Sequence, residues 1–453
     1  MPDPPAFEPR SPFETAFKTA IEGADAYRAV RAGLRLHDDI LRIGNRFVAA
    51  DRFREIGYVA LGNAAGSMAL AAQEMLGERL TQGLSAGAVA APEPLQFQHQ
   101  VVPDPWPGSA PADTARESAL ELAGGLHAGD LLLVLLSAGA FSVTAGAPSG
   151  WDHDDWRRLL QRVTATSSPV DAVRVARVLG TGAVGGRLGA VVGDALVVTL
   201  VVDRGEGPEW VGGGPTIPLR PEESESVRVL LSGTRAAEDV RDPAIRGGGN
   251  VHRPVVVTGP ADAIEAAGNQ LAGQGWISRL ASLHLAGSPE EVANQFVQGM
   301  ETIRREQVSE PIRSAAAAED GSTESSTVSA IEALGDPETR GWTQTPTPGH
   351  PKSRGLAVFA ATTFNTVEGG ETGDQVREFL RAMARNLVRR EAYAGALRTA
   401  GGIPDRRDPA GSWLARRSGG AIAPEPALET YSVRPGFTDV GTVLVGFLPW
   451  GAR

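Results

Sequence analysis

Three turns rich in small residues are the stretches of this sequence best suited to holding an anion. They read "LGNAAGSMA" (61–69), "LLSAGAFS" (135–142) and "VGGGPT" (211–216). Small residues let backbone N–H groups approach a ligand closely, and in an open parallel sheet ligands bind beyond the carboxyl ends of the strands. The first turn carries Asn63, whose amide can donate hydrogen bonds but supplies no charge. The alternative, that all three are ordinary tight turns between strands and helices, stays open.

The run Gly180-Thr181-Gly182-Ala183-Val184-Gly185 satisfies the GxGxxG pattern of dinucleotide-binding proteins. In those proteins the loop leads from a strand into a helix whose first N–H groups hold the pyrophosphate. Here "VDAVRVARVL" before the run has helical spacing, and "RLGAVVGDALVVTLVV" after it is typical of a strand. We therefore expect no helix after Gly185 and no NAD or FAD site.

Other catalytic patterns are absent from the sequence. Cysteine does not occur, which excludes a thiol nucleophile and cysteine-ligated metal sites. Neither GxxxxGK[ST] nor HExxH is present, and the two lysines are Lys18 and Lys352. The acidic residues around His153 in "WDHDDW" are interpreted as the first turn of a helix, where the helix dipole favours negative charge.

Strands that alternate with helices predict the fold class. Apolar strands are expected at 57–61, in "GLSAGAVAA" and in "DLLLVLLSAGAFS", with helices at 64–76 and in "DTARESALELAGGL". Strands that are apolar throughout indicate a parallel sheet covered on both faces. The prediction is an α/β protein with a Rossmann-like, doubly wound parallel sheet domain and a second, smaller α/β domain across a cleft.

Composition shifts predict four segments along the chain. They are a Rossmann-like domain (1–248), a connecting βα segment (249–308), a linker rich in Ser, Thr, Pro and Gly (309–353) and a C-terminal domain (354–453). In the last of these, a strand is expected in "LAVFAATTF", a helix over 374–397 and a terminal strand in "TVLVGFLPW".

Charge and hydropathy limit the partners and the location. With 43 basic and 54 acidic residues the formal net charge is −11, which disfavours a general nucleic-acid binder. The longest apolar stretch, "LGAVVGDALVVTLVV", is interrupted by Asp194 and is too short to span a membrane. The start "MPDPPAFEPR" lacks the pattern of a signal peptide, so a cytoplasmic protein without membrane or nucleic-acid partners is expected. A homodimer is left open.

Six segments in order resemble the type of glycerate 2-kinase whose second domain carries the MOFRL motif. They are "FREIGYVALGNAAGSMA", "QHQVVPDPWPGSAPADTARESALELAGGL", "GDLLLVLLSAGAFSVTAGAPSG", "VRVARVLGTGAVGGRLG", "VGGGPTIP" and "PGFTDVGTVLVGFL". The resemblance implies ATP and Mg²⁺ as cofactors and a small hydroxy acid such as D-glycerate as the phosphoryl acceptor. It also implies a lysine in the first turn as the catalytic cation, at the position where this chain has Asn63.

The same resemblance assigns roles to further residues. It implies Arg177 and Lys352 as catalytic cations beside the Asn63 position, and Asp203 as the ligand of the metal. For the substrate and the nucleotide it implies Gly62, Ser137, Gly139, Gly185, Gly186, Gly214, Thr216 and Arg354. The family's TDGxDGPTDAAG segment has no clear counterpart in this chain.

Two hypotheses follow from this divergence. In the first, the chain is a divergent glycerate 2-kinase-like phosphotransferase acting on a small hydroxy acid, with Lys352, Arg177 or Arg354 supplying the charge of the missing lysine. In the second, it is a repurposed pseudokinase that binds a metabolite or partner, or an enzyme of a different reaction in the same cleft. Phosphoryl transfer depends on positive charge around the transferred oxygens, so the substitution at Asn63 separates the two hypotheses.

Overall fold

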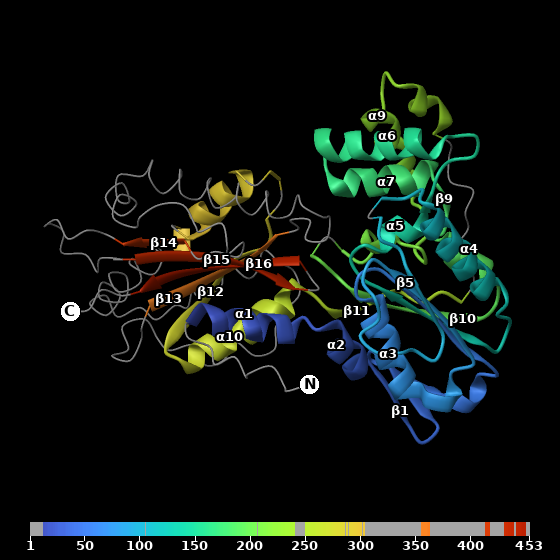
Figure 1. The fold of residues 1–453 in the computed structure, drawn as a ribbon, viewed down its shortest axis with the longest axis horizontal. Helices are drawn as coiled ribbons and strands as arrows, with labels where there is room; N and C mark the ends of the chain where they lie inside the picture. The colour runs from blue at the N-terminus through green and yellow to red at the C-terminus, as the bar shows by residue number, and fades with distance from the viewer. Residues whose placement is uncertain are drawn as a thin grey trace, which may run out of the picture. The chain divides into compact units, whose positions relative to one another are not determined.

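The computed structural model divides into two compact units, Ala24–Pro260 and Met1–Gly23 with Ala261–Arg453 (Figure 1). We call them the first and the second unit. The structure describes residues 12–104, 106–205, 207–240, 250–285, 287–288, 290–300, 302–303, 355–362, 413–416, 430–438 and 441–449.

A six-stranded parallel sheet forms the centre of the first unit, in the order β11-β10-β7-β4-β5-β6. Its strands are β4 (Ile56–Leu61), β5 (Gln82–Gly87), β6 (Gln98–Val101), β7 (Leu131–Leu136), β10 (Leu196–Val202) and β11 (Val255–Thr258). Every residue of β4 and β7 is buried, which explains why these strands are apolar throughout. The predicted doubly wound parallel sheet is confirmed.

Helices cover both faces of this sheet. On one face, four buried alanines of α4 (Ala110–Gly124) pack in the same core as Val59, Leu61 and Val134. On the other, Gln73 of α3 (Ala65–Leu76) donates to the hydroxyl of Tyr58, 2.8 Å away. Because neighbouring residues of a strand point to opposite faces, Tyr58 and Val59 place α3 and α4 on opposite sides.

The order of the strands creates a switch point between β4 and β7. From β4 the chain proceeds outward through β5 and β6, then returns to β7 and proceeds the other way through β10 and β11. In sheets of this topology a crevice opens at the carboxyl ends of the two central strands, and ligands bind there. The turns after β4 and β7 are two of the three small-residue turns of the sequence.

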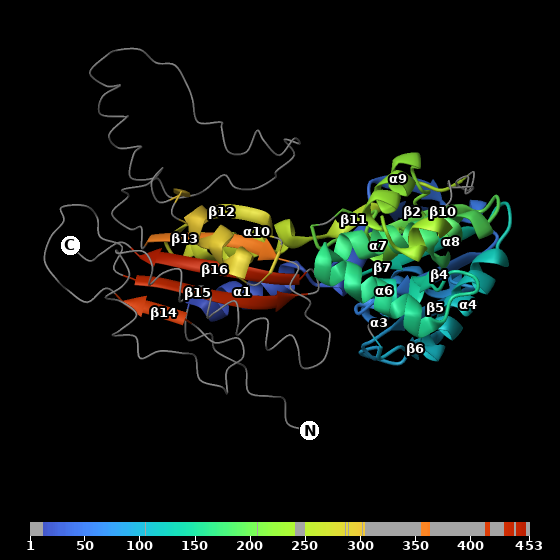
Figure 2. The same ribbon diagram turned by 90° about the horizontal axis from the view of Figure 1, so that it is seen from above.

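A helical layer lies beside the carboxyl-end turns. Helices α6 (His153–Thr166) and α7 (Pro169–Leu179) run side by side and share a core with α9 (Pro221–Leu230) (Figures 1 and 2). Asp152 caps α6 by accepting the N–H of Asp154, which confirms the helix-capping interpretation of "WDHDDW".

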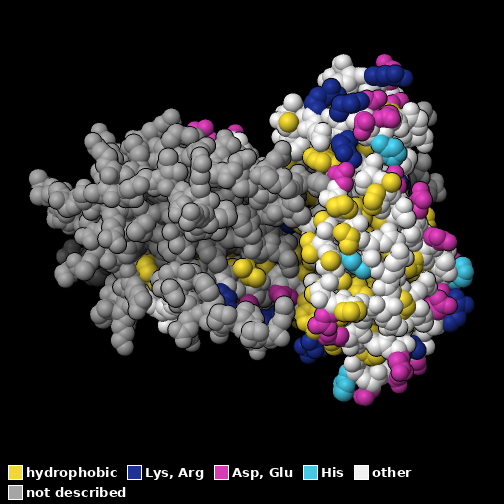
Figure 3. Space-filling view, in the orientation of Figure 1, with side chains coloured by type: hydrophobic (Ala, Val, Ile, Leu, Met, Phe, Trp, Pro, Cys, Tyr) yellow, Lys and Arg dark blue, Asp and Glu magenta, His cyan; other side chains and the backbone are white. Residues whose placement is uncertain are grey.

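Charged side chains gather over this layer in Figure 3. Several of them pair within one helix, at a spacing of three residues, as Arg158 does with Asp155 and Arg228 with Glu225. Such exposed pairs contribute little to stability and leave this surface mixed in sign.

Shorter elements complete the first unit. Strands β1 (Leu34–His37), β2 (Ile40–Ile43) and β3 (Arg46–Ala49) form an antiparallel sheet, and β8 (Ala145–Gly146) pairs with β9 (Thr181–Gly182). The remaining helices and 3-10 turns are α2 (Ala26–Gly33), η1 (Ala50–Arg52), η2 (Gly77–Arg79), α5 (Ala140–Thr144), α8 (Arg187–Val191), η3 (Val211–Gly213) and η4 (Arg235–Asp239).

The second unit has a five-stranded sheet in the order β12-β13-β16-β15-β14. Its strands are β12 (Trp276–Leu285), β13 (Gly355–Thr362), β14 (Trp413–Arg416), β15 (Thr430–Thr438) and β16 (Gly441–Pro449). Strands β12 and β13 are parallel and the other pairs antiparallel. Helices α1 (Pro12–Gly23) and α10 (Pro260–Gly273) and helical residues 290–300 belong to this unit.

The predicted boundaries differ from this division. The segment 249–308, predicted to be a separate connection, is shared: β11 pairs with β10 in the first unit, and β12 pairs with β13 in the second. Helix α1 joins the second unit because its end packs on α10, where a Cβ on Gly23 would come 2.6 Å from the Cβ of Ala266. Strand pairing between distant segments decides these boundaries. The predicted linker 309–353 and the predicted helix 374–397 lie outside the described residues.

A short helix follows the GxGxxG run, so the expectation that no helix follows it was wrong. Helix α8 begins after Gly186 and has five residues. It follows α7 and the two-residue strand β9, which pairs antiparallel with β8 outside the main sheet. The run therefore lacks the setting of a dinucleotide loop, which opens from a strand of the parallel sheet.

Candidate functional site

The turns after β4 and β7 touch at the switch point. The backbone N–H of Asn63 donates to the carbonyl of Ala138 (2.7 Å), and the N–H of Ala64 donates to the Ser137 hydroxyl (3.0 Å). Gly62 has φ +115, and a Cβ there would come 2.5 Å from both the carbonyl oxygen and the Oγ of Ser137. Only glycine fits this close approach of two turns.

These contacts use the N–H groups that lead into α3, up to its first residue. Besides Asn63 and Ala64, Ala65 donates to the carbonyl of Gly62 (3.1 Å). The beginning of a helix binds anions through such N–H groups, so donors already committed within the protein cannot serve a ligand. Ser137, which is 1% exposed, therefore positions α3 and does not face a ligand.

The side chain of Asn63 and the second turn are among the places where donors remain open. Asn63 is half-buried and its amide lies against Gly139, where a Cβ would come 2.5 Å from Oδ1. Within the part of the chain that the structure describes, the Asn63 side chain and the N–H groups of Ala138 and Gly139 make no hydrogen bond to protein. Gly139, at φ +80, is exposed. Three neutral donors without a protein partner thus lie in the two contacting turns at the switch point, where they could serve an anionic oxygen.

Arg177 is committed elsewhere, which argues against its predicted role as a catalytic cation. Its side chain is 1% exposed, with Nε and Nη2 donating to the two carboxylate oxygens of Glu223 (2.7 and 2.9 Å). Nη1 donates to the carbonyl of Gly213 (2.9 Å) and the guanidinium lies 5.6 Å from the centre of the Trp210 ring. Burial raises the pKa of Glu223, but the hydrogen bonds and charge of Arg177 outweigh it and lower the pKa overall.

The glycines predicted to bind substrate surround Arg177. Gly185 and Gly186 donate to the carbonyls of Gly213 and Gly214, each at 2.9 Å, and all four are buried. A Cβ on Gly214 would collide with the Arg177 guanidinium. Thr216, 3% exposed, bonds through its hydroxyl to that of Thr199 on β10 (2.7 Å). Together these residues join α7 to the segment of η3, and Thr216 joins that segment to β10. No hydrogen bond among the described residues links any of them to Asn63.

Asp203 follows β10 at the same edge of the sheet as the switch point. Its carboxylate accepts the N–H of Gly207 (3.2 Å). Burial, the largest cause, raises the pKa of Asp203 above its usual value; hydrogen bonds from backbone N–H groups oppose the rise, and the Glu209 charge adds to it. A carboxylate shifted in this way at a strand end is a functional-site candidate.

A metal ion at Asp203 would need ligands beyond the protein. No group of three or more His, Cys, Asp or Glu side chains suited to a metal occurs among the described residues. Mg²⁺ is commonly held by one or two carboxylates together with water and substrate phosphates, so Asp203 fits such an ion as its protein ligand. Lys352 and Arg354, the other predicted cations, lie outside the described residues.

Two features of the site were missed in the sequence. Glu223, the partner that neutralises Arg177, lies 46 residues further along the chain in no recognisable motif. The open N–H groups of Ala138 and Gly139 belong to the backbone and have no signature beyond a small-residue turn. No helix of the described residues is long and apolar enough to cross a membrane.

Comparisons with known proteins identify the family of this chain. The family described as "Domain of unknown function (DUF4147)" matches residues 13–246. A Danio rerio protein named glycerate kinase is 29% identical over 225 residues, 44% of this chain and 43% of its own length. A Thermotoga maritima protein named D-glycerate 2-kinase is 28% identical over 188 residues, 40% of this chain and 45% of its own. The chain thus spans less than half the length of these two relatives.

The fold is also that of a solved structure. The crystal structure of glycerate kinase from Thermotoga maritima superposes with a TM-score of 0.53 at 18% identity, covering 83% of this chain and 80% of that chain. A likeness at this identity concerns the fold alone. The family model matches more than half of the chain. The chain therefore belongs to the DUF4147 family, which is the glycerate 2-kinase family that the six sequence segments resemble.

Proposed function

We propose that this chain is a phosphotransferase of the glycerate 2-kinase type, which transfers the γ-phosphate of Mg-ATP to a hydroxyl group of a small hydroxy acid. One observation carries the proposal: the two turns that meet at the switch point between β4 and β7 contain the Asn63 amide and two backbone N–H groups without a protein partner among the described residues. Family membership supports the reaction class, while the substrate follows from the names of the relatives.

The three donors would hold and orient an anionic oxygen of the nucleotide or of the hydroxy acid. Asp203 follows β10, and β10 lies two strands away from β4 in the sheet, at a spacing of about 10 Å. At that distance a metal ion on Asp203 and an anion at Asn63 could both touch one triphosphate. Bound Mg²⁺ supplies positive charge to phosphate oxygens, and Asp203 would keep it at the edge of the crevice.

The missing element is a fixed cation. A neutral amide at Asn63 leaves the transferred phosphoryl group without the charge that a lysine would supply, and Arg177 is neutralised by Glu223. In this proposal Lys352 or Arg354 supplies that charge.

A second candidate function is binding without phosphoryl transfer. The same two facts favour it, a neutral Asn63 and an Arg177 whose guanidinium is fully committed to Glu223 and to backbone carbonyls. A pseudokinase of this kind would bind the nucleotide or the hydroxy acid through the neutral donors and release it unchanged.

The purified protein, incubated with Mg-ATP and D-glycerate, separates the candidates. Phosphoglycerate is measured by mass spectrometry for the natural chain and for Asn63→Lys, Asp203→Asn, Lys352→Gln and Arg354→Gln. Product from the natural chain, lost in Asp203→Asn and in one of the two cation variants, supports the transferase. Product only from Asn63→Lys, with ATP binding to both proteins in calorimetry, supports the binding protein. If no protein yields product and none binds ATP, both candidate functions are contradicted.

A further inference from the structure

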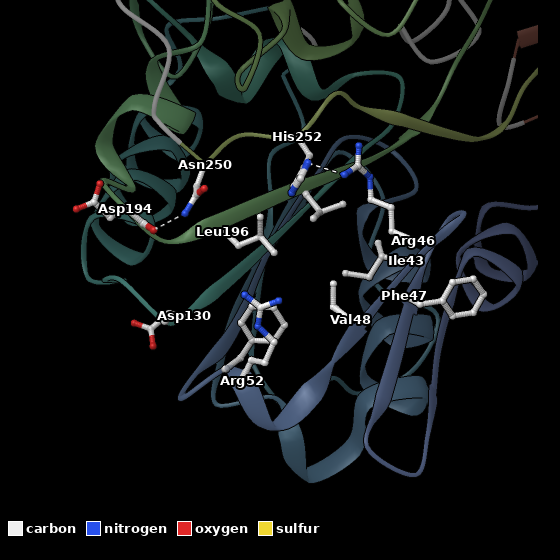
Figure 4. A pocket seen from close by; sticks show the side chains of 13 residues that line it. Ile43, Arg46, Phe47, Val48, Arg52, Asp130, Asp194, Leu196, Asn250 and His252 are labelled. Atoms are coloured by element: carbon white, nitrogen blue, oxygen red, sulfur yellow. Dashed lines mark hydrogen bonds between the residues drawn. The ribbon is translucent and has the colours of Figure 1, made fainter.

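A cavity lies at the opposite edge of the parallel sheet, away from the switch point. It has a volume of about 530 Å³ and opens between the β2–β3 hairpin and the amino ends of β7 and β10 (Figure 4). Strand β7 has six residues, so the two edges are about 20 Å apart. Volumes of this order are typical of small-molecule sites. The cavity is therefore separate from the crevice at Asn63.

Two guanidinium groups give the cavity its charge. Arg46 lies on β3 and its Nη1 is 2.6 Å from Nδ1 of His252, while Arg52 ends η1 and points toward Leu196 (Figure 4). Burial, followed by the charge of Arg46, lowers the pKa of His252, so the neutral imidazole accepts the bond from Arg46. Within the described residues, Arg52 has no hydrogen-bond or ion-pair partner.

The acidic side chains of the lining do not cancel this charge. Asp130, 1% exposed, accepts two hydrogen bonds from Arg54 and one each from the N–H groups of Glu55 and His127. Its charge is thus already balanced. Asp194 is exposed and is directed away from the two arginines in Figure 4. An excess of positive charge remains on the side of the cavity formed by the hairpin.

Much of the remaining lining is apolar. Ile43, Val48, Phe53, Leu196 and Val198 contribute hydrophobic side chains, and Phe47 is 69% exposed at the rim. Inorganic phosphate alone would leave this surface in contact with water. A ligand that satisfies both parts of the lining carries an anionic group and an apolar ring or chain.

The wall that carries His252 is held firmly. The N–H of His252 donates to the carbonyl of Val197 (3.0 Å), and the N–H of Val197 donates to the carbonyl of Asn250 (3.1 Å). The Asn250 side chain also donates to the carbonyl of Asp194 (3.0 Å). Arg46 and His252, which are 206 positions apart in the sequence, are thereby held together in the lining of the cavity, as pre-formed ligand sites require.

We propose that this amino-edge cavity is a second binding site, which takes a small organic anion with an apolar body, its anionic group held by Arg46 and Arg52. The ligand is bound independently of the switch-point crevice, so the proposal does not rest on the proposed function.

The fluorescent probe anilinonaphthalene sulfonate tests this proposal, because it combines a sulfonate with an apolar ring system. Titrated into the full chain, it is expected to bind saturably. The double variant Arg46→Gln/Arg52→Gln should bind about tenfold or more weakly, since each charge-assisted hydrogen bond contributes to the affinity. Phe47→Ala, a change at an exposed position, should weaken binding by a smaller factor. Arg158→Gln, which removes an exposed arginine of α6 outside the cavity, should bind as the natural chain does.

Three outcomes would overturn the proposal. The first is that the natural chain, shown to be folded by circular dichroism, does not bind the probe saturably. The second is that the double variant binds the probe with unchanged affinity. The third is that Asn63→Asp weakens probe binding as much as the double variant does. The last result would place the probe in the switch-point crevice. Competition by unlabelled naphthalene sulfonate, with the same ranking of variants, would support the proposal.

Discussion

The side-chain amide of Asn63 lies so close to Gly139 that a Cβ at position 139 would come 2.5 Å from the amide oxygen. This contact brings the turn after β4 against the turn after β7, at the point where the strand order of the sheet reverses. It also leaves the amide free for a ligand, since Asn63 uses only its backbone N–H in bonding to Ala138.

Gly139→Ala is expected to destabilise the protein more than Gly150→Ala. Both glycines have positive φ, +80 and +83, but a Cβ at Gly150 would meet nothing within 4 Å. The control therefore measures the backbone cost, about 1–2 kcal/mol, and the additional loss for Gly139→Ala, about 1 kcal/mol or more, measures the clash with Asn63. Urea unfolding gives both values. Equal losses would show that Asn63 moves aside at no cost.

Glu223→Gln should lower the free energy of unfolding by roughly 3–5 kcal/mol, because it leaves the buried Arg177 charge without its partner. Glu225→Gln on the same helix removes an exposed partner of Arg228 and should cost at most about 0.5 kcal/mol. Thermal and urea unfolding of the two variants measure the difference. A small effect of Glu223→Gln would mean that Arg177 is not a buried structural cation, and would reopen its assignment to catalysis.

Asp203→Asn is expected to stabilise the protein at neutral pH and to flatten the dependence of its stability on pH. The pKa of Asp203 is raised by burial, so the folded state holds this proton more tightly than the unfolded state. The contribution of Asp203 to the free energy of unfolding is therefore most favourable below pH 3.8, the pKa of the carboxyl in the unfolded state. It is lost as the pH rises through the higher pKa of the folded state. Unfolding experiments from pH 3 to 8, with the exposed Asp51→Asn as control, test this sign. Stability of the natural chain that rises more steeply with pH than that of Asp203→Asn would contradict it.

Added Mg²⁺ should counteract the cost of the ionised Asp203 carboxylate. The natural chain is expected to gain thermal stability with millimolar Mg²⁺ in the presence of ATP, and Asp203→Asn is expected to gain less. An equal gain in both proteins would exclude Asp203 as a ligand of the ion.

Asn63→Asp should weaken the binding of ATP by about tenfold or more, because a carboxylate replaces a neutral donor among groups that face an anion. Asn45→Asp makes the same change in charge at an exposed turn between β2 and β3 and should leave the affinity unchanged. Isothermal titration calorimetry measures both. If the two variants lose affinity equally, net charge and not the Asn63 position is responsible.

Local patterns were sufficient to predict much of the fold from the sequence. Apolar runs such as 131–136 can be accommodated only by a strand covered on both faces, and their alternation with helices leads to a doubly wound sheet. The acidic residues before α6 predicted a helix start for the same local reason, the binding of free N–H groups by a side chain. The neutral Asn63 in the first small-residue turn is likewise visible in the sequence alone, as is the resemblance to the family to which the chain belongs.

Tertiary structure decided what each candidate residue can do. Arg177 and Glu223 are 46 positions apart, and only the packing of α7 against α9 neutralises the charge that made Arg177 a catalytic candidate. The boundary between the units depends on which distant strands pair, and the amino-edge cavity joins Arg46 to His252 across 206 positions. Short-range patterns determine secondary structure through backbone hydrogen bonding and periodic burial, whereas the charge state and accessibility of a side chain are set by neighbours that the order of residues does not reveal.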